Sequence, residues 1–157
     1  MQLIFNAAIF LCPLMASADE AQLPDFQHPP QLYTHTHIIA VNNVGAENGT
    51  SPARVSDEIL LGDRTKTAVK FHLRTLESNY HMCTLAGSAA AIAPNTFEYR
   101  ENDCVLKISY MNSTVKLADI GGFCSRFPGN CGRGALIGNI TLNRAPLRQS
   151  TYWRPKK

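Results

Sequence analysis

Several features of membrane proteins and enzymes are missing from this sequence of 157 residues. After residue 18, no apolar run reaches the length of about 20 residues that a membrane-spanning helix needs. No Gly-x-Ser-x-Gly turn is present to hold a hydrolase serine, and no Cys-x-x-Cys pair is present to form a zinc knuckle. The net charge of only +3 gives no support to nucleic-acid binding, and the basic C-terminal end predicts a solvated tail.

The N-terminal residues have the pattern of a signal peptide. An apolar stretch over residues 3–15 is followed by Ala16-Ser17-Ala18, and this small-x-small pattern predicts cleavage before Asp19. The two residues before the apolar stretch carry no Lys or Arg, which departs from the usual signal peptide. We expect residues 1–18 to be removed on export and the mature chain to be periplasmic or secreted.

Four cysteines remain after that cleavage, and in an oxidising compartment four cysteines are typical of two disulfides. Three pairings are possible. A Pro-Gly turn between Cys124 and Cys131 favours a bridge that closes the short loop between them. We therefore expect Cys124 to pair with Cys131, and Cys83 to pair with Cys104.

Apolar and polar residues alternate with period two over much of the chain, as in half-buried strands. Val69, Phe71 and Leu73 share one face in the clearest of these runs. The same rule places these residues on inward faces: Cys83 with Leu85, Cys104 with Leu106, Ile108 and Tyr110, Val115 with Leu117, and Ile140 with Leu142. Turn residues separate the runs at 77–79, 93–95, 101–103, 111–113 and 121–122, which predicts antiparallel hairpins.

The predicted fold is all-β: a single small antiparallel β-sandwich or barrel of about seven strands with two disulfides. The β domain is expected at residues 32–144. An extended arm with three prolines precedes it at 19–31, and a basic tail follows at 145–157.

A strand is expected over residues 32–41, followed by a polar loop over 42–56. Residues 57–61 are consistent with either a short helical turn or the start of a strand. His35 and His37 lie two residues apart on the first strand, so both imidazoles share one face, as metal ligands on a strand require. Exposed histidine pairs are more common without a metal, and we predict no metal and no cofactor.

The order of several motifs resembles that of a known family. The motifs are Val69-x-Phe71-x-Leu73, Asn79-Tyr80-His81-Met82-Cys83-x-Leu85-x-Gly87-x-Ala89, Phe97-Glu98-Tyr99, Cys104-x-Leu106-x-Ile108, Val115-x-Leu117-x-Asp119 and Cys124 through Cys131-Gly132-x-Gly134. Together they resemble a small secreted domain of Gram-negative bacteria that occurs alone or beside segments named as periplasmic lysozyme inhibitors. The resemblance covers about half of the mature chain and implies a β fold with these cysteines in disulfides. The family has an Ala-Arg-Gly run after its Cys-Gly pair, and Gly132-Arg133-Gly134 is one residue shorter.

The candidate binding site is the stretch of residues 124–131, which we call the cysteine loop. It presents Arg126, Phe127 and Asn130, and Arg133 follows it closely. A loop restrained by a disulfide loses little conformational entropy when it docks. Lysozyme-type glycosidases keep two carboxyl groups about 5 to 9 Å apart in an open cleft. We therefore expect Arg126 or Arg133 to enter such a cleft, with Phe127 as an apolar anchor.

These observations predict an exported protein-binding module and not an enzyme. The expected partner is a protein: a cell-wall-degrading enzyme of lysozyme type that the chain inhibits, or a toxin against which it acts as an immunity protein. The alternative is a non-enzymatic cell-envelope protein, binding or structural, that recognises glycan or peptide through exposed aromatic residues: Tyr33, Tyr99, Tyr110 or Trp153. Four acidic residues are expected in turns or at the surface: Glu98, Glu101, Asp103 and Asp119.

Overall fold

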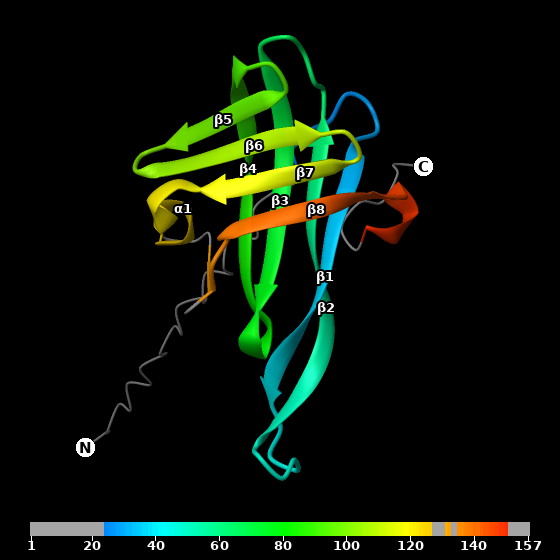
Figure 1. Cartoon of the computed structure of the whole chain (residues 1–157), viewed down its shortest axis with the longest axis vertical. Coiled ribbons are helices and arrows are strands. Elements are labelled where there is room, and N and C mark those ends of the chain that lie inside the picture. The colour runs from blue at the N-terminus through cyan, green and yellow to red at the C-terminus, as the bar shows by residue number, and fades with distance from the viewer. Residues whose placement is uncertain (1–23, 127–130, 133–134, 151–157) are drawn as a thin grey trace, which may run out of the picture.

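The computed structural model describes residues 24–126, 131–132 and 135–150, so the expected signal peptide lies outside the described residues. Eight antiparallel strands follow one another in chain order, and the last pairs with the first to close a barrel (Figure 1). The all-β prediction is confirmed, with eight strands where about seven were expected. The elements are β1 Gln31–Asn42, β2 Thr50–Gly62, β3 Ala68–Glu77, η1 Ser78–Tyr80, β4 His81–Ala93, β5 Thr96–Glu101, β6 Cys104–Met111, β7 Thr114–Asp119, η2 Ile120–Gly122, α1 Phe123–Arg126, β8 Asn139–Ala145 and η3 Leu147–Gln149.

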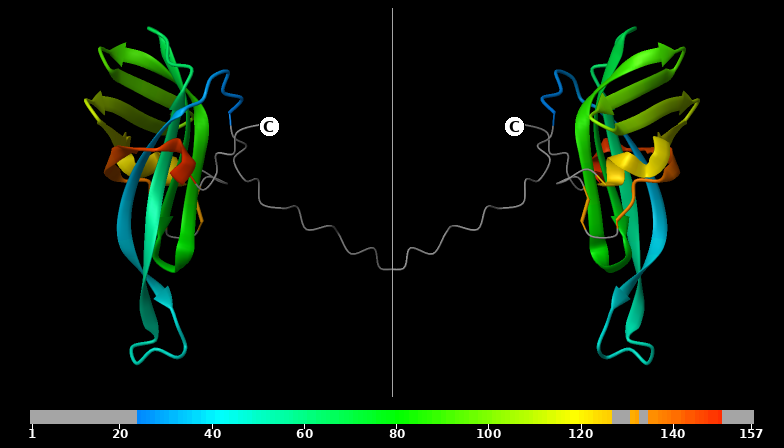
Figure 2. Two further views of the ribbon diagram at one scale, coloured as in Figure 1. Left: turned by 90° about the vertical axis from the view of Figure 1, so that its right-hand side faces the viewer. Right: turned by 90° about the vertical axis from the view of Figure 1, so that its left-hand side faces the viewer.

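Two sets of strands lie across one another and enclose the core. The strands β1–β4 run along the long axis of the molecule, and β5–β8 cross in front of them (Figures 1 and 2). Val69, Phe71 and Leu73 of β3 are all 0% exposed, so the predicted inward face is confirmed. Other strands contribute these core residues: Ile59, Leu85, Leu106, Ile108, Val115, Leu117 and Leu142. Burial of this apolar surface is the main force that holds the two sets together. Across the described ranges, no helix is long and apolar enough to cross a membrane.

The strand β4 joins the two sets, because it pairs with β3 over most of its length and with β5 only at its end. Gly87 of β4 lies against the ring of Tyr99, and a Cβ at this position would lie 2.6 Å from Cε2 of that ring. Tyr99 in turn meets Phe71 edge to face, with the ring centroids 5.1 Å apart. Tyr99 is therefore a core residue, and the exposed position expected for it is wrong.

Asparagines form three of the predicted hairpin turns. Asn95, Asn102 and Asn112 have φ angles of 57°, 50° and 56° and connect β4 to β5, β5 to β6 and β6 to β7. Asparagine adopts this left-handed conformation more readily than most residues because its short polar side chain bonds to the local backbone. The turns predicted at these positions are confirmed.

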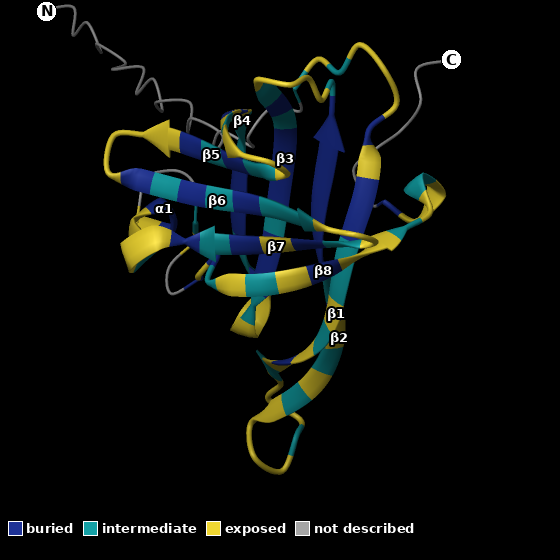
Figure 3. Ribbon diagram, turned by 45° about the horizontal axis from the view of Figure 1, so that its top comes forward, coloured by how far each residue is buried: buried dark blue, intermediate teal, exposed yellow. Residues whose placement is uncertain are grey.

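The prediction of a polar loop over residues 42–56 is wrong for most of this range. Only residues 43–49 connect β1 to β2, and the two strands pair in continuous register from Asn42 and Thr50 onward. Residues 57–61 are also strand. Pro52 suggested a loop, but β2 pairs with β3 only from Glu58, and proline is tolerated in a strand that has one edge without a partner. Residues 36–56 thus form a projecting hairpin that extends past the barrel (Figures 1 and 3).

Asp63 fixes the N-terminal arm to the connection between β2 and β3. Its carboxylate accepts hydrogen bonds from the backbone N–H groups of Gln27 (2.9 Å) and His28 (3.2 Å) and lies 3.0 Å from Nζ of Lys70. The Lys70 ammonium also donates to the carbonyl of Asp25 at 2.8 Å. The bond from Gln27, followed by those from Lys70 and His28, lowers the pKa of Asp63 to about 2.

This shift predicts that the arm detaches in acid. The pKa of Asp63 is lowered from an ordinary value of 3.8. The contribution of its carboxylate to holding the arm is therefore complete above pH 3.8 and is lost as the pH falls through about 2. The amide resonances of Gln27 and His28 should shift in that window in an NMR titration. In the Asp63→Asn variant the same amides should show no such transition; a transition that survives the substitution would assign the titration to another group.

Candidate functional site

Both disulfides join the segment between β7 and β8 to earlier strands. Cys124 in α1 is bonded to Cys104 at the start of β6, and Cys131 is bonded to Cys83 near the start of β4. All four cysteines are therefore in disulfides, as predicted. The expected pairing of Cys124 with Cys131, and of Cys83 with Cys104, is wrong.

The order of the strands explains this pairing. In the sheet β5 lies between β4 and β6, so Cys83 and Cys104 are not on neighbouring strands. Cys131 forms a β-bridge with Cys83, and the N–H of Gly132 donates to the carbonyl of Met82 at 2.8 Å. The cysteine loop is thus not closed on itself, because β6 holds one end of it and β4 holds the other.

A buried aspartate secures the start of the cysteine loop. Asp119 Oδ1 accepts a hydrogen bond from the N–H of Cys124 (3.1 Å), and Oδ2 accepts bonds from the N–H (3.2 Å) and the hydroxyl (2.8 Å) of Ser125. The Ser125 hydroxyl oxygen accepts a further bond from the N–H of Ile137 at 2.8 Å, which ties this point to the return of the chain toward β8.

Sequence reasoning missed this network. Asp119 and Ser125 are each only 8% exposed, so the surface position expected for Asp119 is wrong. The signal that was available is an aspartate shortly before a short helix, where a carboxylate accepts hydrogen bonds from free N–H groups at the helix start.

Arg126 is the one predicted binding residue that falls within the described ranges. It is exposed at the end of α1, and its guanidinium carbon lies 5.7 Å from the centroid of the Phe123 ring. Phe123 is itself 45% exposed, so it offers beside the arginine the aromatic surface that was expected from Phe127. Phe127, Asn130 and Arg133 lie outside the described residues.

The first two strands bring three potential metal ligands together. His35 is opposite Asp57 in the register of β1 and β2, and His37 lies two residues farther along β1. The ligand atoms of the three side chains lie within 4.8 Å of one another. Burial raises the pKa of Asp57, against the opposing effects of a hydrogen bond from the Leu76 N–H and of the two imidazoles. Asp57 had no signal in the sequence, because only the hairpin register places it beside the histidines.

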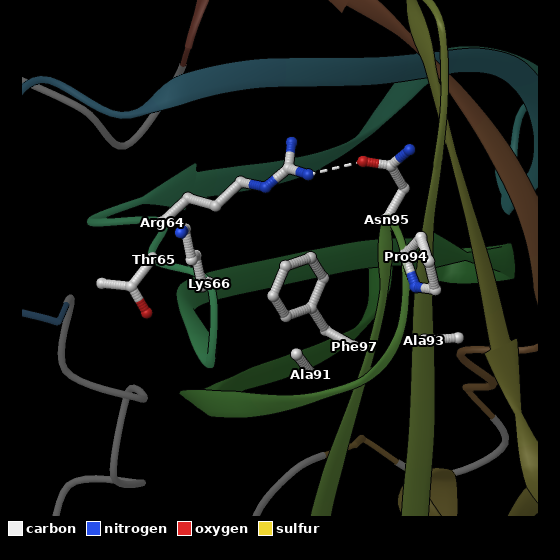
Figure 4. Close-up of a pocket in the computed structure, with 8 residues that line it drawn as sticks. All are labelled: Arg64, Thr65, Lys66, Ala91, Ala93, Pro94, Asn95 and Phe97. Carbon is white, nitrogen blue, oxygen red and sulfur yellow. Dashed lines mark hydrogen bonds between the residues drawn. The ribbon is translucent and has the colours of Figure 1, made fainter.

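A second polar feature lies where Arg64 bridges two connections of the barrel. Its Nη2 donates to Oδ1 of Asn95 at 2.7 Å beside a pocket of about 780 Å³ (Figure 4). The guanidinium carbon lies 4.3 Å from the Tyr110 ring centroid and 5.4 Å from that of Phe97. Arg64 therefore occupies the aromatic surface that Tyr110 was expected to offer to a ligand.

Tyr33 is also unsuited to the expected glycan-binding role. It is 2% exposed, and its hydroxyl donates to Oε1 of Gln31 at 2.9 Å. The exposed position expected for Tyr33 is wrong for the same reason as that of Tyr99: both rings lie in the core. Trp153 lies outside the described residues.

No family model, curated protein or solved structure matches the chain. The resemblance to the domain associated with periplasmic lysozyme inhibitors therefore stays a prediction.

Proposed function

We propose that the chain is an exported module that binds a cell-wall-degrading enzyme of lysozyme type and inhibits it through the cysteine loop. The observation that carries this proposal is the double attachment of the loop, by Cys104–Cys124 at one end and Cys83–Cys131 at the other. A loop whose two ends are fixed has few conformations to lose on binding, so more of its contact energy appears as affinity. The disulfides are also compatible with an oxidising, extracytoplasmic compartment.

The chemistry of Arg126 supports an acidic partner. A guanidinium forms paired, charge-assisted hydrogen bonds with a carboxylate, and a lysozyme-type cleft carries two carboxyl groups about 5 to 9 Å apart. The Phe123 ring lies within cation–π distance of the Arg126 guanidinium, at 5.7 Å from its carbon. The net charge of +3 is positive, which favours encounter with an acidic cleft.

The direct test is an inhibition assay. The oxidised protein is incubated with muramidases of several structural types at physiological ionic strength, and the residual rate of cell-wall lysis is measured. Stoichiometric inhibition of one type is the expected result. If none of the enzymes is inhibited by an excess of the protein, the inhibitor proposal fails, and sedimentation with purified cell wall then tests the envelope-binding alternative.

Arg126→Ala should weaken inhibition at least tenfold, which corresponds to about 1.4 kcal/mol, because an arginine at the centre of an interface is a frequent hot spot. Arg148→Ala is the matched control: Arg148 is an exposed arginine in η3, on the opposite side of the view from α1 (Figure 1). Both variants should unfold at the wild-type urea concentration, because exposed substitutions rarely change stability by more than about 0.5 kcal/mol. Equal inhibition by the two variants would remove Arg126 from the binding site.

A further inference from the structure

The His35, His37 and Asp57 cluster lies where the projecting hairpin leaves the rest of the sheet. The strand β2 pairs with β3 only from Glu58 onward, and before this residue side chains make the contact with the β3 backbone. Asp57 Oδ1 accepts a hydrogen bond from the N–H of Leu76 at 2.9 Å, and His37 Nε2 lies 3.0 Å from the carbonyl oxygen of the same residue. A small apolar cluster of Ile39, Val55 and Leu76 follows on the same face of the hairpin, because Ile39 and Val55 lie two residues from His37 and Asp57.

The hydrogen bond to Leu76 fixes the proton on the His37 ring. A carbonyl oxygen can only accept, so Nε2 of His37 must donate, and in a neutral imidazole this leaves a lone pair on Nδ1. That Nδ1 is buried and has no hydrogen-bond partner among the described residues. It lies 3.5 Å from Oδ2 of Asp57, whose side chain is 5% exposed. Two acceptors thus face each other in a buried site, which is unfavourable unless a cation lies between them.

The distance between these two atoms suits a metal ion better than a shared proton. A protonated imidazole that donates to a carboxylate brings the two heavy atoms to about 2.7 to 2.9 Å, which is shorter than the 3.5 Å found here. Two ligands of a tetrahedral zinc ion with bonds of 2.0 to 2.1 Å lie roughly 3.3 Å apart. The separation of His37 Nδ1 and Asp57 Oδ2 is therefore close to that of two ligands on one metal ion.

His35 supplies the third ligand. Its ring stacks on that of His37, with centroids 5.5 Å apart and planes 21° apart, and its ligand atom lies within 4.8 Å of the other two. Because His37 and Asp57 are already 3.5 Å apart, His35 is the ligand that would turn toward them to complete the site. The contact of His37 with the Leu76 carbonyl is the kind of outer hydrogen bond that orients metal-bound histidines.

We propose that His35, His37 and Asp57 bind one Zn²⁺ ion, which cross-links β1 and β2 at the base of the projecting hairpin and leaves a fourth position for water. Two imidazoles and one carboxylate favour zinc over magnesium and calcium, which prefer oxygen ligands. The buried charge of Asp57 is then balanced by the ion. This site is separate from the cysteine loop, so it stands or falls independently of the proposed inhibition.

The test is a calorimetric titration of the metal-free, oxidised protein with Zn²⁺ alone. Saturation at one ion per chain is expected, and Mg²⁺ should give no saturable binding. His35→Gln removes one ligand and leaves the contacts between His37, Asp57 and Leu76 in place, so the affinity should fall at least tenfold. His28→Gln is the matched control, since the His28 side chain is 82% exposed and lies beside Asp63. This variant should bind Zn²⁺ with the affinity of the wild type.

The histidine ring resonances of the wild-type protein provide a second measurement, which decides the question even if His35→Gln fails to fold. Zn²⁺ should shift the resonances of both His35 and His37 and leave His28 unchanged. The proposal is overturned if no saturable binding occurs, if binding survives His35→Gln at full strength, or if it is lost in His28→Gln. It is equally overturned if His37 is protonated on both nitrogens and added zinc leaves it so.

Discussion

Replacing Cys83 and Cys131 together with alanine is expected to lower the free energy of unfolding by about 3.5 kcal/mol. The two disulfides are nested, because the pair separated by 20 residues lies inside the pair separated by 48. With the inner bridge in place, the outer bridge closes a loop of roughly 28 residues in the unfolded chain, and its loss frees that loop. Loss of both bridges should cost about 7 kcal/mol by the same relation, which is as much as the whole stability of many domains.

Urea unfolding of the oxidised Cys83→Ala/Cys131→Ala variant measures this effect. The comparison is the Cys104→Ala/Cys124→Ala variant, whose free energy of unfolding should fall by about 3 kcal/mol. If the proposed inhibition is observed, the variant without Cys83 and Cys131 should also inhibit less strongly under conditions where it remains folded, because the end of the cysteine loop next to β4 is released. An unfolding curve that coincides with that of the wild type would contradict this pairing of the cysteines.

Asp119→Ala should destabilise the protein by about 3 to 5 kcal/mol. The substitution removes the acceptor of three hydrogen bonds from Cys124 and Ser125, and a buried donor left without a partner costs about 1 to 3 kcal/mol. Asp119→Asn keeps one carbonyl oxygen and should cost less. The matched control is Asp103→Ala, which changes an exposed aspartate in the turn between β5 and β6.

Chemical denaturation gives the size of the Asp119 effect, and hydrogen exchange shows where it acts. The amides of Cys124, Ser125 and Ile137 should lose protection in Asp119→Ala, because each is bonded to Asp119 directly or through the Ser125 hydroxyl. Equal unfolding midpoints for Asp119→Ala and Asp103→Ala would show that this network does not stabilise the fold.

The features that follow from local chemistry were predictable from the sequence. The inward face of β3 follows from period-two alternation at Val69, Phe71 and Leu73, and the turns at Asn95 and Asn102 follow from the conformations that asparagine tolerates. Each of these needs only residues that are close together in the chain.

The features that depend on distant strands were not predictable. The true partner of Cys124 depends on the position of β5 between β4 and β6, which no local pattern shows. Asp57 joins the two histidines only through the register of β1 and β2. The burial of Tyr33 was hidden because tyrosine is suited both to a core and to a binding surface, and only the contacts decide between them.

The closure of the barrel by β1 and β8 has a consequence for the newly made chain. Leu32, Tyr33 and Thr34 pair with Ala145, Arg144 and Asn143, which follow them roughly 110 residues later, and such distant pairings form slowly. During synthesis, one edge of β1 stays without its partner, and an unpaired edge is a template for association with other chains. A chain that ends before β8 exposes the edges of both β1 and β7, so resistance to aggregation depends on the last strand to be made.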